Sequence, residues 1–217
     1  MAGTNAASSQ AQKLTVALDL PAARVLADQI STIQDLQFVM ECCKRLLTEL
    51  VKPEDEREPV VPQALWSAAL MAYDRCFTRG KRFGLTADDV RSLPLEGQVL
   101  KFHNWIVEER DQLARHPADP YDVARVGAVL SGPDDRGVQG ITVLSASHIL
   151  VDGAGVRQLG ALASELAKQT AEKAQKQEST VLAETQQISL DKLYALPPLP
   201  VGAPGEETGE DSVADEA

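Results

Sequence analysis

The sequence predicts a mainly α-helical fold, with one antiparallel β-hairpin inserted before the last long helix. Three separate runs carry apolar residues at the 3.6-residue spacing of amphipathic helices. Two later runs, "DVARVGAVLS" and "GITVLSASHIL", are rich in β-branched residues and flank the turn-forming stretch "GPDDRGVQ". With 217 residues, the chain is long enough to bury the core of one domain.

The first helix is predicted from about Pro21 to Val51. Its second half places these apolar residues at helical spacing: Ile33, Leu36, Val39, Met40, Cys43, Leu46, Leu47 and Leu50. The stretch "KPEDEREPVVP" then has three prolines and four acidic residues, which is typical of a connection. Pro62 can open a second helix, and Gly80 can end it.

The third helix is predicted from about Leu95 to Arg115, after the connection "KRFGLTADDVRSLP". The hairpin should occupy about residues 122–150. A last helix begins near Asp152, a residue type that caps helix N-termini, and continues into a polar Ala/Lys/Gln/Glu stretch. We therefore expect a disordered segment at 1–20, one domain at 21–185, and a proline-rich linker with an acidic tail at 186–217.

The charge and composition limit the classes of function. The net charge is −11, but the last thirteen residues hold six acids and no base, which leaves −5 for residues 1 to 204. This balance argues against broad electrostatic binding to nucleic acid, although it allows a local basic site. No apolar run reaches the roughly 20 residues of a membrane helix, and the N-terminus is unlike a signal peptide. Three cysteines suit a reducing compartment, so we expect a cytoplasmic protein with no membrane partner.

The third helix carries an arginine on its apolar face. Val99, Phe102, His103, Ile106, Arg110 and Leu113 share one stripe at helical spacing. A buried guanidinium is costly when unpaired, so Arg110 needs an acid, backbone carbonyls or an anionic ligand. Asp111 points about 100° away and is expected to orient a neighbour rather than neutralise Arg110 directly. His116 precedes a proline, which predicts that the last turn of the helix unwinds there. Its position near the helix C-terminus favours the protonated imidazole.

Arg110, the polar Asp111 and His116, which follows Arg110 after five intervening residues, resemble the Arg-polar-x(3–5)-His signature of the HEPN superfamily. The stretches "ALWSAALMAYDRCFTRGKR" and "ERDQLARHPADPYD" look like an uncharacterised bacterial branch of it, and the resemblance covers about Ile33 to His116. It implies a HEPN-like helical bundle that acts as a metal-independent endoribonuclease in a toxin or phage-defence context. It also implies a homodimer with a composite site and no cofactor.

The same resemblance implies a role for each motif residue. Arg110 would hold the scissile phosphate of an RNA, and His116 would exchange a proton with the ribose 2′-hydroxyl or the leaving oxygen. Asp111 would orient one of them. The basic residues Arg75, Arg79 and Arg82, which close the second helix, would border the RNA path. Arg115 would add a phosphate contact. Cations at a helix C-terminus are also stabilising without any ligand.

Non-catalytic readings of the same residues stay open. Arg110 and His116 can cap the helix and pair with acids such as Asp119 or Asp122, as in a HEPN-like binding or regulatory module. A helical scaffold that meets a protein partner through its C-terminal tail is a further alternative. The glycines of "VDGAGVRQLG" lack the spacing of a dinucleotide-binding loop. The histidines show no metal-selecting pattern, so neither a metal nor a cofactor is expected.

Overall fold

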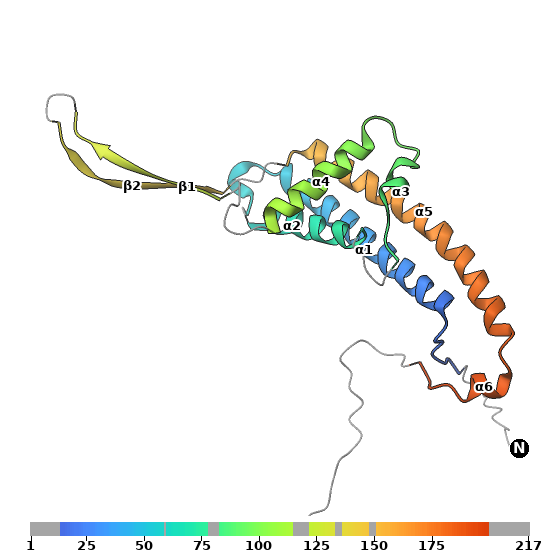
Figure 1. Cartoon of the computed structure of the whole chain (residues 1–217). Helices are drawn as coiled ribbons and strands as arrows, with labels where there is room; N and C mark the ends of the chain where they lie inside the picture. Colours follow the sequence, from blue (N-terminus) through green and yellow to red (C-terminus); the bar gives the residue numbers. More distant parts are fainter. Residues whose placement is uncertain are drawn as a thin grey trace, which may run out of the picture.

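The computed structural model describes residues 14–58, 60–77, 83–114, 122–132, 136–147 and 151–199. Its helices are α1 (Pro21–Leu50), the 3-10 turn η1 (Glu54–Glu56), α2 (Val60–Arg75), α3 (Ala87–Arg91), α4 (Val99–Ala114), α5 (Gly153–Gln186) and α6 (Leu190–Tyr194). Its strands are β1 (Asp122–Leu130) and β2 (Val138–Ser147). The structure confirms the predicted class, mainly α with an antiparallel hairpin before the long helix α5 (Figure 1).

Helices α1 and α5 form the long antiparallel scaffold of the molecule (Figure 1). Near the start of α5, a Cβ built on Gly160 would lie 3.5 Å from the Cβ of Cys43 on α1, so the two backbones approach closely. Towards the other end, Gln177 Nε2 donates a hydrogen bond to the carbonyl of Ala22 at 2.9 Å. The predicted stripe of α1 lies on the buried side of the helix, because Leu36, Val39, Cys43 and Leu46 are all buried.

The core is completed by α2, which packs on α1, and by α4, which packs on α2. Pro62 lies in the first turn of α2, as the sequence predicts, although the helix begins at Val60 and ends at Arg75 rather than near Gly80. The rings of Trp66 and Trp105 bring α2 and α4 together, with their centroids 6.3 Å apart. Alanines on α2 at positions 69 and 72 are fully buried, so neighbouring helices can approach closely.

Helix α3 lies within the stretch that the sequence indicated to be a plain connection. It begins with a capping box, in which Thr86 and Asp89 each bond the other's backbone N–H. Five residues are too few to show a helical period, and only Val90 among them is buried. This is why apolar spacing did not predict the helix.

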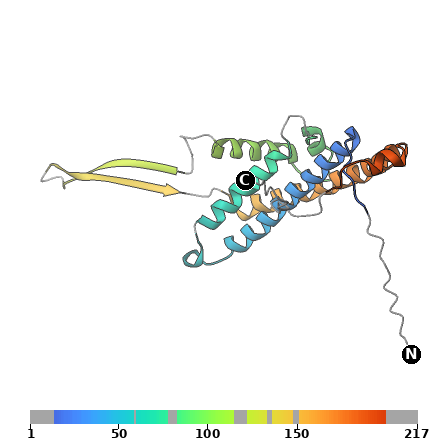
Figure 2. The ribbon, with the colours of Figure 1, turned by 90° about the horizontal axis from the view of Figure 1, so that it is seen from below.

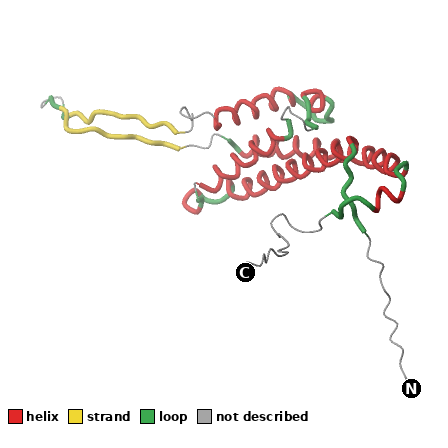
Figure 3. Tube along the Cα trace, turned by 60° about the horizontal axis from the view of Figure 1, so that its bottom comes forward, coloured by secondary structure: helices red, strands yellow, loops and turns green. Residues whose placement is uncertain are grey.

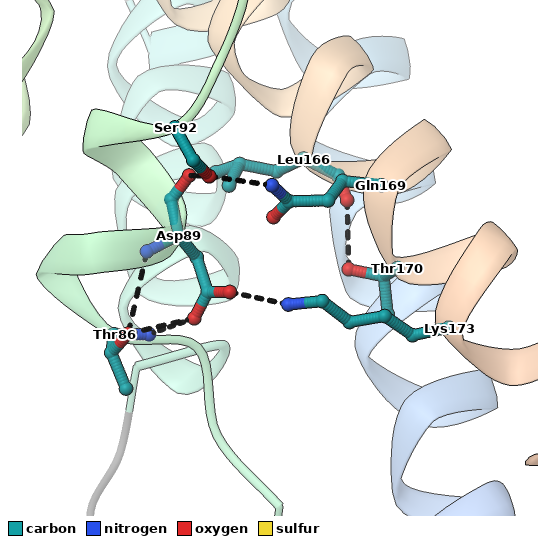
Figure 4. A network of polar contacts seen from close by, with 7 residues as sticks. All are labelled: Thr86, Asp89, Ser92, Leu166, Gln169, Thr170 and Lys173. Carbon is teal, nitrogen blue, oxygen red and sulfur yellow. Dashed lines mark hydrogen bonds and ion pairs between the residues drawn. The ribbon is translucent and has the colours of Figure 1, made fainter.

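Side chains of α5 fix α3 in place (Figure 4). Lys173 forms an ion pair with Asp89, and Gln169 Nε2 donates to Ser92 Oγ at 2.7 Å. Asp89 therefore serves both its own capping box and the contact with α5. The α3 segment is therefore held by the polar half of α5. From composition, that half was expected to be a polar stretch exposed to solvent.

The strands β1 and β2 form a ribbon that projects from one end of the helical body (Figures 1 and 2). Val126 lies opposite Val143 in the register, and an irregularity follows Val129. The two strands make up the whole of the sheet that the described residues form. The hairpin was predicted at about residues 122–150, but its projection away from the helices was not.

The described ends of the chain meet at the other end of the molecule (Figure 3). The backbone N–H of Leu199 donates to the carbonyl of Thr15 at 2.9 Å, and that of Ala17 donates to Pro197 at 3.1 Å. The predicted linker and the predicted N-terminal segment thus contribute a short bridge, and the linker also contains α6. Residues 1–13 and 200–217 lie outside the described residues. In the part of the chain described, no helix has the length and apolarity to cross a bilayer.

Candidate functional site

The guanidinium of Arg110 is shared by two carboxylates. From α4, its Nη2 reaches the carboxylate of Asp74 on α2, and its Nη1 lies 2.9 Å from Asp111 Oδ1. The side chain is 27% exposed, so the pair is largely shielded from water. Of the partners expected for Arg110, which were an acid, backbone carbonyls or an anionic ligand, the structure supplies two acids. Asp111 was expected only to orient a neighbour, but it contacts Arg110 directly. The long arginine side chain can reach the carboxylate of the adjacent residue.

These contacts fix the charge of the site. The hydrogen bond that Arg110 donates to Asp74 raises the pKa of Arg110 above its usual value, outweighing the opposite effect of burial, so the guanidinium stays protonated. One guanidinium therefore serves two carboxylates. Arg110 Nε is buried and has no hydrogen-bond partner among the described residues.

The remaining predicted site residues are only partly placed. His116 and Arg115 follow α4 and lie outside the described residues, as do Arg79 and Arg82. The structure therefore brings together Arg110 and Asp111 and adds Asp74, which sequence reasoning missed. The sequence did offer one indication of Asp74. It is the sole acid of α2, a helix whose other residues are largely apolar and buried.

Arg75 is directed to a different helix from its neighbour Asp74. Its guanidinium lies 2.6 Å from Asp35 Oδ1 on α1, and this hydrogen bond raises the pKa of Arg75. The side chain is 58% exposed. Consecutive residues on a helix diverge by about 100°, so Asp74 and Arg75 contact α4 and α1 respectively. The described member of the predicted basic cluster thus joins α2 to α1 and does not contact the Arg110 cluster.

His103 is a hydrogen-bonded histidine of the core. Its Nδ1 lies 2.8 Å from the hydroxyl of Tyr73, and its ring centroid is 4.5 Å from that of Phe77. Burial lowers the pKa of His103 and raises the pKa of Tyr73, so both groups are held neutral at pH 7. Within the described ranges, no three His, Cys, Asp or Glu side chains gather as a metal site would require.

An open groove of about 500 Å³ runs between α4 and α5, and we refer to it as the α4–α5 groove. Its apolar lining comes from both helices and from the turn before α4: Leu95, Val99, Phe102, Trp105, Ala161 and Leu162. Gly97 turns the chain into α4 with a φ of 92°, a conformation that other residues rarely adopt. Sequence reasoning did not find this groove, because Trp105 lies off the main apolar stripe.

The glycines at the start of α5 have structural roles. Asp152 accepts a hydrogen bond from the backbone N–H of Gly155 at 2.7 Å, which is the predicted N-cap. Gly160 lies in the packing of α5 on α1, where an added Cβ would make an ordinary contact with Cys43. Both positions are explained by capping and packing, without a nucleotide.

Comparison with family models, curated proteins and solved structures finds no match to this chain. The resemblance to the HEPN superfamily therefore rests on the motif of Arg110, Asp111 and His116.

Proposed function

We propose that this protein is a non-catalytic helical interaction module that works by binding other protein chains. The observation that carries the proposal is the charge around Arg110, where Asp74 and Asp111 both engage the one guanidinium. Binding a phosphate requires a cation whose charge is available, and here the ligand would have to displace carboxylates. This competition for the guanidinium disfavours the catalytic role.

Exposed apolar surfaces supply the positive argument for binding. The hairpin carries several large aliphatic side chains that are mostly exposed to solvent, and the α4–α5 groove is lined mainly by apolar groups. Contiguous apolar surface of this kind usually marks a site of protein association. In this function, Arg110 ties α4 to α2 and so helps to hold one wall of the groove.

A metal-independent endoribonuclease of the HEPN type is the second candidate. The observation that favours it is the buried Nε of Arg110, a donor that has no partner among the described residues and that a phosphate oxygen could satisfy. Arg110 would then hold the phosphate, His116 would move the proton and Asp111 would orient the guanidinium. No cofactor takes part in this mechanism, and the toxin or defence context belongs to this candidate alone.

The two candidates differ in one assay. Purified protein is incubated with structured and unstructured RNAs in EDTA, alongside His116→Ala and Lys101→Ala, a matched loss of an exposed cation on α4. We expect no cleavage by any of the three. Cleavage by wild type and Lys101→Ala that survives chelation and vanishes in His116→Ala would overturn the interaction module and establish the nuclease.

A cytoplasmic location is part of the proposal. Cys42, Cys43 and Cys76 are buried free thiols, and burial raises the pKa of Cys43 and of Cys76 to about 12. Thiols held protonated in this way are inert core residues, which suits a protein of a reducing compartment. Fractionation of cells that express the protein with a short epitope tag would test the location.

A further inference from the structure

We draw no further inference here: the strongest candidate, the exposed aliphatic face that the cross-strand pairs Val126–Val143, Ala128–Ile141 and Leu130–Val138 form on the β1–β2 hairpin, carries none, because nothing in the described part of the chain shows what covers it.

Discussion

Arg110 and Asp74 join the end of α4 to the end of α2 through a largely shielded ion pair, and Asp111 holds the second nitrogen of the same guanidinium. One arginine thus forms ion pairs with acids from two helices. This arrangement has a direct consequence for stability, because removing the guanidinium takes away a contact that both carboxylates share.

Arg110→Ala should lower the free energy of unfolding by about 1–3 kcal/mol, since it removes a largely shielded ion pair between α4 and α2. Urea denaturation at pH 7 measures this. Arg75→Ala is the matched control, because it removes a more exposed arginine from one ion pair and should cost less than about 1 kcal/mol. Equal losses in the two variants would contradict a structural role for Arg110.

The hydrogen bond between His103 and Tyr73 predicts how stability depends on pH. Burial lowers the pKa of His103 below its usual 6.5, so the unfolded chain takes up the proton first. The stabilising contribution is complete above the unfolded pKa and is lost as the pH falls below 6.5. Melting temperatures measured from about pH 8 to pH 5 should decline for the wild type, and less steeply for His103→Gln. Parallel curves would refute the assignment.

The contact between Asp89 and Lys173 should control the local stability of α3. Burial opposes ionisation of Asp89, but hydrogen bonds from Lys173 and Thr86 outweigh it and lower the pKa. Asp89→Ala removes its half of the capping box and the tether, whereas Lys173→Ala removes only the tether. Hydrogen exchange over residues 87–91 should therefore accelerate more in Asp89→Ala. This stabilisation should also fade as the pH falls below 3.8, the usual pKa of an aspartate.

Gly160 and Gly155 predict opposite responses to alanine. A Cβ at Gly160 would lie at an ordinary contact distance, 3.5 Å from Cys43, so Gly160→Ala should stabilise the helix by about 0.5–1 kcal/mol. At Gly155 the new Cβ would lie 3.2 Å from Val151, too close without a local shift. Gly155→Ala should therefore gain less or lose stability. Thermal melts of the two variants, compared directly, check the order.

Sequence periodicity was sufficient for the long elements and insufficient for their contacts. The helices α1 and α5 were predicted because many apolar residues repeat along them, and the hairpin because β-branched runs flank a turn. Helix α3 was missed because its stability comes from a capping box and a salt bridge rather than from an apolar stripe.

The candidate site also shows that periodicity predicts elements and does not predict the contacts between them. The position of Arg110 on a buried stripe predicted that it needs a partner, with an acid as one of three possible kinds. That the acid is Asp74 depends on how α2 crosses α4, which no spacing within either helix determines. The role of Trp105 in the groove was not predicted for a related reason. The groove that it lines exists only where α4 and α5 come together.

The bridge between Thr15 and Leu199 also determines how the molecule would respond to a pulling force. The described chain enters and leaves at one place, so a load applied to its two ends acts first on a pair of antiparallel backbone bonds. In this geometry the bonds open one after the other, as in a zipper, and offer little mechanical resistance. The helices would bear tension only after the bridge has opened, and the hairpin at the opposite end would be the last segment to sense it.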